Sequence, residues 1–444
     1  MANGVVTRED VHRLVKEHDV KIINLWFVDI LGMLKSFGIP PVQLEEALEE
    51  GLGFDGSSVE GFARIYESDL LAIADPSTFQ ILPWKIEGHA HARMMCDIQN
   101  PDRTPYAGDP RYILRRNLKK AKDLGFTCYV GPELEYFYLK SHDDPRAVDH
   151  AGYFDQIPDD VGNELRHSTI QALQSMGISV ECGHHEVAPS QHEIDLKYSD
   201  ALHMADTTVT YRYVVKWIAR QRGLYATFMP KPLFGENGSG MHVHQSLFRG
   251  DTNAFFDPKD SHGLSKLGRA YMAGVMRHAC EITAVTNQWV NSYKRLVPGY
   301  EAPVYVAWGQ RNRSALVRVP MYKPGKEKAT RIEFRCPDPA CNPYLAFAVM
   351  LAAGLKGIQE GYELPPPVEE DIFHMTDAEK TARSIDTLPG SLFAAIQLAE
   401  KSELMRETLG EHVFTKFIQN KKIEWDNYRI QVTGYEIDRY LPIL

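Results

Sequence analysis

The sequence contains no apolar run long enough to cross a membrane. None of its apolar stretches reaches the about 18 residues that a membrane-spanning helix needs. The first twenty residues, MANGVVTREDVHRLVKEHDV, also lack the apolar core of a signal peptide. We therefore expect a cytoplasmic protein that has no membrane partner.

Patterned cysteine and excess positive charge are also missing. The six cysteines show no CxxC spacing, which indicates reduced thiols in a cytosolic protein rather than a disulfide framework. The 49 basic residues are outnumbered by 59 acidic ones, so the net charge is −10. This balance does not favour a nucleic-acid partner.

The length of 444 residues allows two or three domains with a large core. The turn-rich stretch DIQNPDRTPYAGDPR, residues 97–111, is the best candidate boundary, so we expect an α+β protein with units at 1–104 and 105–444. In the second unit amphipathic helices alternate with short strands. The stiff segment LPPPVEE, residues 364–370, then leads into a helical tail.

Capping and turn signals predict the elements of the first unit. Thr7 and Asp10 form a capping-box pattern at the start of a helix. The next segment, KIINLWFVDILGMLKSFGIP, predicts two strands around a turn at 29–32. Pro41 at a first-turn position and Gly51 after the end bracket a second helix over VQLEEALEE.

Two carboxylates stand among aromatic residues in the stretch GPELEYFYL. In a strand Glu133 and Glu135 point to one face, while Tyr136 and Tyr138 take the other. Two like charges side by side are costly unless a cation lies between them. The stretch therefore suggests a bound cation, although a strand with two acids is more often an exposed sheet face.

Four separated segments place polar, metal-competent residues on one face of a strand. These are Glu133 and Glu135, then Glu186 and Glu193 in HHEVAPSQHEIDL, then His242, His244 and Ser246 in GSGMHVHQSLF, then Arg331, Glu333 and Arg335 in TRIEFR. Such a set fits Mg²⁺ or Mn²⁺, which prefer oxygen ligands with an occasional imidazole. Zinc is disfavoured, because no cysteine or close histidine pair supplies its usual ligands.

Spacing alone leaves the convergence of these segments open. Taken singly, His242 is more often a hydrogen-bonded structural histidine than a ligand. His184 and His185 are taken as structural or supporting residues beside Glu186.

Arginine supplies a second signal within about forty residues. The six arginines are Arg295, Arg311, Arg313, Arg318, Arg331 and Arg335. Their apolar neighbours indicate half-buried strands and loops, and guanidinium groups beside a metal cluster suit phosphate and carboxylate ligands. A nucleic-acid patch is disfavoured, because Glu301, Glu327 and Glu333 lie in the same region. The glycine-rich stretch FGENGSGMH lacks the lysine of a Walker loop and predicts a loop whose backbone approaches a small ligand.

At these residues the sequence resembles a known family. NGSGMHVHQS, KPLFG, NSYKRLVPGYEAP, RNRSALVRVP, RIEFR and DPACNPYLAF, together with FDGSS and ESDL, resemble the bacterial and archaeal type I glutamine synthetases over nearly the whole chain. The resemblance implies ATP-dependent ligation of ammonia to glutamate through γ-glutamyl phosphate. It also implies a small β-grasp-like domain, a catalytic domain with an antiparallel sheet, and twelve subunits in two hexameric rings with active sites between neighbours.

The resemblance assigns roles to matching positions. Two or three divalent cations, Mg²⁺ or Mn²⁺, are expected per subunit, one held by Glu135, Glu186 and Glu193 and another by Glu133, His242 and Glu333. Glutamate is expected at Asn237, Gly238, Arg295, Glu301 and Arg335. ATP is expected at Glu181, His244, Ser246, Arg313, Arg318, Lys328 and Arg331. Asp55, Glu301 and Arg313 are expected to act in catalysis: Asp55 resembles the acid that binds ammonium, and Glu301 the acid on a closing flap.

Departures from the family pattern bear on regulation. The tyrosine that some members adenylylate falls near Phe373, so we do not expect that modification. Arg64 in GFARIYESDL matches an arginine used for glutamine feedback in the compact subclass, although a surface arginine paired with Glu67 or Asp69 is an equally good reading. A small regulatory protein or a transcription regulator is left open as a partner.

Two rival functions remain at this point. A γ-glutamyl ligase for larger amines is disfavoured, because Asp55 is present and such relatives often lose this acid. A catalytically inactive relative is disfavoured, because it has no physical reason to retain a costly charged cavity.

Overall fold

The computed structural model describes residues 6–62, 69–158, 160–299, 302–321 and 323–444. Arg64 and Glu301, which the sequence assigns to feedback and to the flap, lie outside the described residues. Within the described part of the chain, no helix is both long and apolar enough to cross a membrane.

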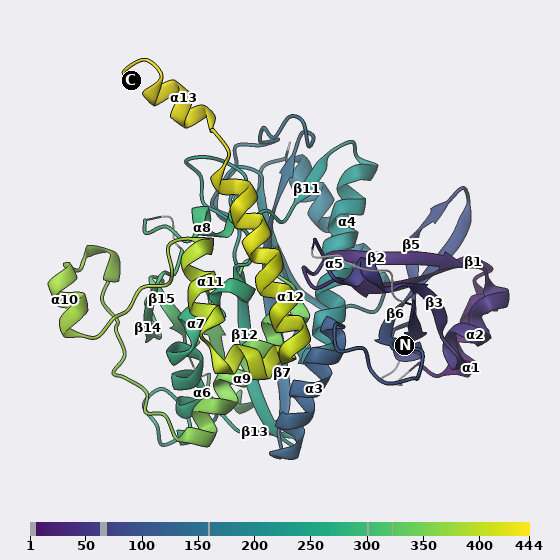
Figure 1. The fold of residues 1–444 in the computed structure, drawn as a ribbon, viewed down its shortest axis with the longest axis horizontal. Coiled ribbons are helices and arrows are strands. Elements are labelled where there is room, and N and C mark those ends of the chain that lie inside the picture. Colours follow the sequence, from purple (N-terminus) through teal and green to yellow (C-terminus); the bar gives the residue numbers. More distant parts are fainter. Residues whose placement is uncertain (1–5, 63–68, 159, 300–301, 322) are drawn as a thin grey trace.

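The first sheet is built from the N-terminal hundred residues (Figure 1). Its strands run in the order β2-β1-β6-β4-β3, with β5 paired to β6. Their bounds are β1 (Val20–Val28), β2 (Leu34–Ile39), β3 (Leu52–Asp55), β4 (Asp69–Ala74), β5 (Gln80–Ile86) and β6 (His89–Gln99). Helices α1 (Arg8–Glu17) and α2 (Leu44–Glu49) share one apolar core with this sheet.

The local signals of this unit are confirmed. The capping box at the start of α1 forms, with Asp10 N donating to Thr7 Oγ1 at 3.2 Å and Thr7 N donating to Asp10 Oδ2 at 3.1 Å. Strands β1 and β2 flank the predicted turn, where Gly32 has a φ of 78°. The second predicted helix begins as a 3₁₀ turn at Pro41–Gln43 and continues as α2, and Gly51 follows with a φ of 75°.

The second sheet has ten strands and forms the floor of the larger unit. Its order is β14-β15-β16-β12-β7-β9-β8, with β10 and β11 on β7 and β13 on β12. Among the described strands every pairing in this sheet is antiparallel except that of β14 with β15. The bounds are β7 (Thr127–Leu139), β8 (Val180–His185), β9 (Gln191–Leu196), β10 (Ser199–Asp200), β11 (Tyr225–Thr227), β12 (Met241–Arg249), β13 (Thr252–Asn253), β14 (Tyr305–Gly309), β15 (Ala315–Arg318) and β16 (Ile332–Phe334).

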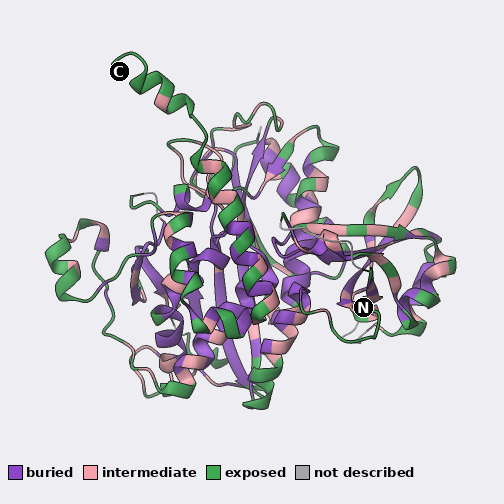
Figure 2. Cartoon of the chain, in the orientation of Figure 1, coloured by how far each residue is buried: buried purple, intermediate pink, exposed green. Residues whose placement is uncertain are grey.

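Helices cover one face of this sheet. The helices of the larger unit are α3 (Pro110–Asp123), α4 (Val161–Ser175), α5 (Ala201–Gln221), α6 (Lys266–Arg277), α7 (Ala279–Thr286), α8 (Ser292–Arg295), α9 (Pro343–Glu360), α10 (Asp377–Ala382), α11 (Leu392–Glu400), α12 (Glu403–Arg429) and α13 (Gly434–Tyr440). Of these, α3, α4, α5 and α6 contact the strands of the sheet, while α10 and α13 lie away from it. Short 3₁₀ turns lie at Gly56–Val59, Pro76–Thr78, Glu327–Ala329 and Ile372–His374. Tyr136 and Tyr138 of β7 are fully buried in the main apolar core, and the ring of Tyr136 lies against Tyr211 of α5. Figure 2 shows that much of this sheet is buried. The other face of β7 is therefore left for the two glutamates.

A buried arginine connects the first sheet to the helices of the second unit. Arg111, in the first turn of α3, is 2% exposed and forms ion pairs with Asp75 at 2.8 Å and Asp97 at 2.5 Å, both from the first sheet region. It also pairs with Asp206 of α5 at 2.9 Å. Because a buried guanidinium needs every one of its donors satisfied, this network fixes the first unit against the helices of the second.

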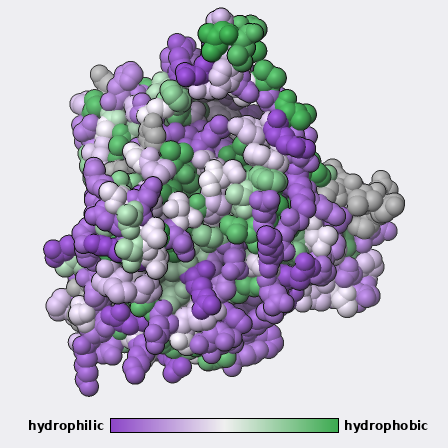
Figure 3. Space-filling view, turned by 60° about the vertical axis from the view of Figure 1, so that its left-hand side comes forward, coloured by the Kyte–Doolittle hydropathy of each residue, from purple (hydrophilic) through white to green (hydrophobic). Residues whose placement is uncertain are grey.

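The C-terminal segment projects from the end of α12 (Figure 1). Figure 3 shows apolar side chains gathered at this end of the molecule. The exposed apolar residues of the segment are Ile430, Val432, Tyr435, Ile437, Tyr440, Leu441, Ile443 and Leu444. A run of this kind on an exposed helix suggests an interaction surface.

Candidate active site

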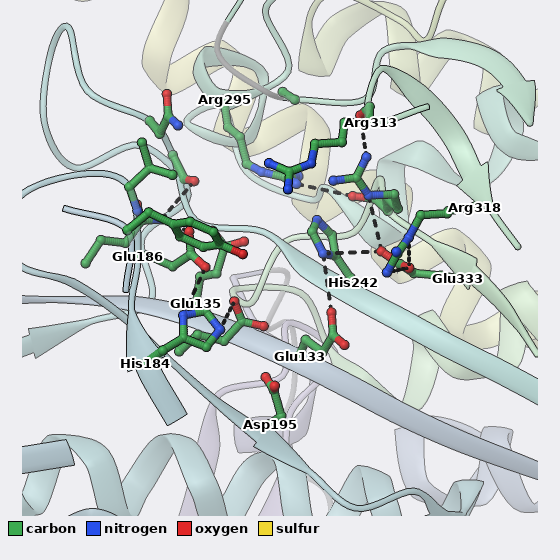
Figure 4. Close-up of a pocket in the computed structure, with 18 residues that line it drawn as sticks. Glu133, Glu135, His184, Glu186, Asp195, His242, Arg295, Arg313, Arg318 and Glu333 are labelled. Carbon is green, nitrogen blue, oxygen red and sulfur yellow. Dashed lines mark hydrogen bonds and ion pairs between the residues drawn. The ribbon is translucent and has the colours of Figure 1, made fainter. Parts of the chain in front are cut away.

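A polar cavity of about 280 Å³ opens on the face of the second sheet that the helices leave uncovered (Figure 4). Its acidic lining residues are Glu133, Glu135, Glu186, Glu193, Asp195 and Glu333. Its basic lining residues are Arg295, Arg313, Arg318 and Arg335, and its histidines are His184 and His242. The four separated segments therefore meet at this cavity, a convergence that the spacing in the sequence leaves open.

Strand pairing brings these side chains together. On one side of β7, Glu133 lies directly opposite His242 of β12. On the other side, Glu135 lies directly opposite Glu193 of β9. Residues paired across antiparallel strands share a face and lie close together, so the register alone places two pairs of candidate ligands in the cavity.

The first cluster consists of three carboxylates. One oxygen each from Glu135, Glu186 and Glu193 lies within 4.8 Å of the others. Gly240 N and Gln191 Nε2 donate to Glu135 Oε2 at 2.8 and 2.9 Å. Burial, followed by the charge of Glu186, nevertheless raises the pKa of Glu135 to about 8. Burial and then the neighbouring acids also raise the pKa of Glu193 well above its ordinary value.

The second cluster combines two carboxylates with an imidazole. His242 Nδ1 lies 3.5 Å from Glu133 Oε2 and 3.6 Å from Glu333 Oε1. Burial and the nearby Arg335 lower the pKa of His242, so its ring is neutral and has a free electron pair, as a metal ligand must. Burial opposes ionisation of Glu133, but His244 and His242 outweigh it and hold its pKa far below the ordinary value.

A third group shares one acid with the first cluster. One ligand atom each from His184, Glu193 and Asp195 lies within 4.8 Å of the others. Sequence reasoning did not single out Asp195, although it lies two residues beyond Glu193 on the same strand. Gln191, two residues before Glu193 on the same strand, was not singled out either. The two-residue strand period could have found both.

Backbone carbonyls hold two arginines of the cavity, Arg295 and Arg335, in place. Arg295 Nη1 donates to Cys336 O at 2.7 Å, and its Nη2 donates to Arg335 O at 3.2 Å. Arg335 Nε lies 3.2 Å from Glu333 Oε1, while its Nη1 donates to the carbonyl of Arg313. Both Arg295 and Arg335 are buried, so their charges face the cavity instead of bulk water. Arg311, in contrast, is exposed and is not among the described residues that line it.

A second pocket, of about 160 Å³, adjoins the acidic cavity. It collects five of the residues expected to bind ATP: Glu181, His244, Ser246, Lys328 and Arg331. Glu133 and Asp195 line both pockets. The other two residues expected to bind ATP, Arg313 and Arg318, line the acidic cavity instead.

A hydrogen-bonded chain runs along the boundary of the two pockets. Arg331 Nε donates to His244 Nδ1 at 3.0 Å, so this nitrogen carries the lone pair. His244 Nε2 therefore carries the proton and donates to Glu133 Oε1 at 2.7 Å. The chain fixes the tautomer of His244 and links an arginine of the second pocket to a candidate metal ligand.

The remaining predicted site residues lie in different places. Asn237 and Gly238, from the glycine-rich loop, line the acidic cavity, which also includes Tyr153, a residue with no signal in the sequence analysis. Asp55 lies at the exposed end of β3 in the first sheet and is not among the described residues that line either pocket. Its carboxylate accepts from Ser57 N at 2.9 Å and from Ser57 Oγ at 2.8 Å.

Comparisons with known proteins agree on one family. The model described as glutamine synthetase, beta-Grasp domain, matches residues 19–101, and that described as glutamine synthetase, catalytic domain, matches residues 107–440. The chain is 55% identical to the glutamine synthetase of Mycolicibacterium smegmatis over 442 residues, covering 98% of this chain and 99% of the relative. It is 51% identical to that of Methanosarcina mazei over 442 residues, covering 99% and 98%.

Solved structures give the same result. A structure titled as apo GmaS without ligand matches with a TM-score of 0.87 at 30% identity, covering 97% of this chain and 99% of that one. The glutamine synthetase of Plasmodium falciparum matches with a TM-score of 0.86 at 26% identity, covering 98% of both chains.

The first cluster predicts that Glu135→Gln stabilises the metal-free protein. The pKa of Glu135, about 8, is raised above the ordinary 4.5. The folded protein therefore binds the proton of Glu135 more tightly than the unfolded chain does, and this stabilises the fold. The stabilisation is complete below about pH 4.5 and is lost as the pH rises through 8. Glutamine stays neutral throughout. We expect the variant to exceed the wild type by on the order of 1–3 kcal/mol at pH 8 and by less at pH 6.

The measurement is unfolding in EDTA at both pH values. Glu363→Gln, at an exposed position, serves as the matched control and should follow the wild type. Equal free energies of unfolding for Glu135→Gln and the wild type at pH 8 would show that ionising the buried Glu135 carboxylate does not destabilise the fold.

Proposed function

The chain belongs to the glutamine synthetase family, and from that premise we propose how its two adjoining pockets make glutamine from glutamate and ammonia at the expense of ATP. The observation that carries the proposal is the position of the two ligand clusters. They lie between buried arginines on one side and the nucleotide-side pocket on the other, and Glu133 belongs to both pockets.

We propose that the two clusters hold divalent cations, Mg²⁺ or Mn²⁺. Five carboxylates and one neutral imidazole are the donors that these ions prefer, and burial together with the charge of Glu186 raises the pKa of Glu135, a cost that a cation would offset. A third ion would fit the group formed by His184, Glu193 and Asp195. When bound, the cations neutralise phosphate oxygens and so make transfer of the γ-phosphoryl group of ATP easier.

Glutamate is expected to lie in the acidic cavity. Arg295 and Arg335 offer fixed guanidinium groups for its carboxylates, because backbone carbonyls already hold both side chains in place. Asn237 and Gly238 reach the same cavity from the glycine-rich loop. This arrangement presents the side-chain carboxylate of glutamate to the nucleotide side.

ATP is expected in the adjoining pocket. Glu181 and Ser246 would lie near the nucleoside, and Lys328, Arg331 and His244 would lie toward the phosphates. A relative at 30% identity, GmaS, has been solved as an ADP complex. Arg313 and Arg318 line the cavity that the γ-phosphoryl group must enter and can neutralise it during transfer.

The two-step chemistry follows from the leaving group. A carboxylate is a poor acyl donor, since ammonia would have to displace an oxide. Phosphorylation of the γ-carboxylate gives γ-glutamyl phosphate, from which ammonia displaces inorganic phosphate. Ammonium must first lose a proton, and a carboxylate such as Asp55 can bind the cation and accept that proton. A flap bearing Glu301 would keep water from the acyl phosphate.

Asp55 points to an assembly of several subunits. It lies in the first sheet and does not line the cavity of its own chain, so we propose that it completes the cavity of a neighbour in a dodecamer of two hexameric rings. The projecting C-terminal segment would join the rings. Its partner surface would be the mostly apolar groove of about 650 Å³, where Lys216 and Lys294 could face Glu436 and Asp438 of the segment.

The function predicts glutamine formation that requires ATP, a divalent cation and ammonia together. Glu333→Gln should abolish most activity by removing a ligand, and Asp55→Asn should lower kcat with ammonia by about 10²–10⁴-fold. Exposed Glu164→Gln is the control and should leave kcat unchanged. Faster turnover of ethylamine or putrescine than of ammonia would instead favour the larger-amine ligase.

Shared sites predict that two inactive variants restore activity when combined. If Asp55 acts in the cavity of a neighbour, assemblies of equal parts Asp55→Asn and Glu333→Gln chains contain some sites with both native residues. Random mixing makes about a quarter of the sites intact, so about a quarter of wild-type activity should return. If Asp55 acts in its own chain's cavity, every site in the mixture carries one lesion and activity stays at the level of the single variants.

A further inference from the structure

A buried Asp–His–His cluster lies on the opposite face of the strands that carry the first metal cluster. His185 and His192 are paired across β8 and β9, both are fully buried, and their ring centroids lie 4.6 Å apart. Asp149, from the segment between β7 and α4, completes the group. The reaction described above uses none of these three side chains.

The cluster has the composition of a metal site, but its hydrogen bonds contradict that reading. Arg166 Nη1 lies 2.7 Å from His192 Nδ1, and arginine can only donate. The lone pair of His192 is therefore on Nδ1 and its proton on Nε2, which is the nitrogen that faces Asp149. A protonated nitrogen cannot bind a metal ion.

His185 instead connects the cluster to a candidate metal ligand. Its Nδ1 lies 2.7 Å from the backbone carbonyl of Glu186, and its Nε2 lies 3.1 Å from Asp149 Oδ1. Both partners are acceptors, so both ring nitrogens donate. The ring thus bridges the anchored carboxylate and the main chain of the residue whose side chain enters the acidic cavity.

Asp149 is itself firmly held. Its Oδ1 accepts from Ser190 N at 2.8 Å and Ala151 N at 3.2 Å. Ser190 Oγ accepts in turn from Val148 N at 2.6 Å and Asp149 N at 3.1 Å. These bonds join the segment around Asp149 to the turn that follows Glu186, behind the ring of His185.

We propose that His185 is a positioning residue for the first metal cluster. Its hydrogen bond to the backbone carbonyl of Glu186 fixes the peptide of Glu186 and through it the direction of the Glu186 carboxylate. The inference rests on the proposed function, in which Glu186 binds a cation. Partners of this kind around metal ligands are typically worth about 10–100-fold in metal affinity.

Two substitutions separate the two hydrogen bonds of the ring. In His185→Gln the side-chain amide nitrogen can reach the position of Nε2 and donate to Asp149, but the donor to Glu186 is lost. In His185→Asn the amide nitrogen can take the position of Nδ1 and donate to Glu186, but it does not reach Asp149. Ser190→Ala is the matched control, because it loosens the segment around Asp149 and leaves the bond from His185 to Glu186 intact.

The experiment is a Mn²⁺ titration of the full-length assembled protein, with free Mn²⁺ followed by electron paramagnetic resonance. We expect His185→Gln to weaken one class of site by about tenfold or more and to leave the other class unchanged. His185→Asn and Ser190→Ala should remain within a few-fold of the wild type. In activity assays His185→Gln should need more Mn²⁺ for half-maximal rate while kcat at saturating Mn²⁺ is retained.

Several outcomes would overturn the inference. Wild-type Mn²⁺ affinity in a folded His185→Gln would do so, as would an equal loss in Ser190→Ala, which would indicate only a general role in holding the segment. If His185→Gln does not fold, a tenfold loss in His185→Asn, which keeps the donor to Glu186, would still contradict it. Two other results would contradict the proposed metal sites themselves. The first is a wild-type protein that binds no Mn²⁺, and the second is a Glu186→Gln variant that keeps both classes of Mn²⁺ site.

Discussion

The site depends on carboxylates that face one another across paired strands in a buried setting. Glu135 lies opposite Glu193, and burial disfavours ionisation of both side chains. Such an arrangement is unfavourable for the protein alone and becomes favourable only when a cation compensates the charge. Burial of the large apolar core on the other face of the sheet stabilises the fold and offsets the free-energy cost of these buried carboxylates.

The two faces of the second sheet have different roles: one packs into the apolar core, and the other carries the charged cavity. Tyr136 and Tyr138 anchor β7 in the helix-covered core, and the alternation of the strand then directs Glu133 and Glu135 into the cavity. The cavity and the nucleotide-side pocket meet at Glu133, which accepts a hydrogen bond from His244. Under the proposed function, the two adjoining pockets would bring the phosphoryl donor and its acceptor side by side, which favours transfer between them.

Much of this site could be predicted from the two-residue strand period. The strand period places Glu133 and Glu135 in the acidic cavity and both His242 and His244 beside Glu133, and the capping box at Thr7 and Asp10 was confirmed. The convergence of the segments could not be derived in this way, because it depends on the order β16-β12-β7-β9-β8. Asp195 and Gln191 were missed although the same period marks them, and Tyr153 comes from a loop that has no period. The role proposed for Asp55 rests on the family resemblance and not on the strand period, because Asp55 is not among the described residues that line the cavity of its own chain.

The central claim is that the two clusters are cation sites on either side of β7. Its most direct test is anomalous diffraction from crystals of the protein grown with Mn²⁺ and ADP. The account predicts one peak among Glu135, Glu186 and Glu193 and another among Glu133, His242 and Glu333. Crystals in which these side chains bind only water, with the anomalous signal elsewhere, would contradict it.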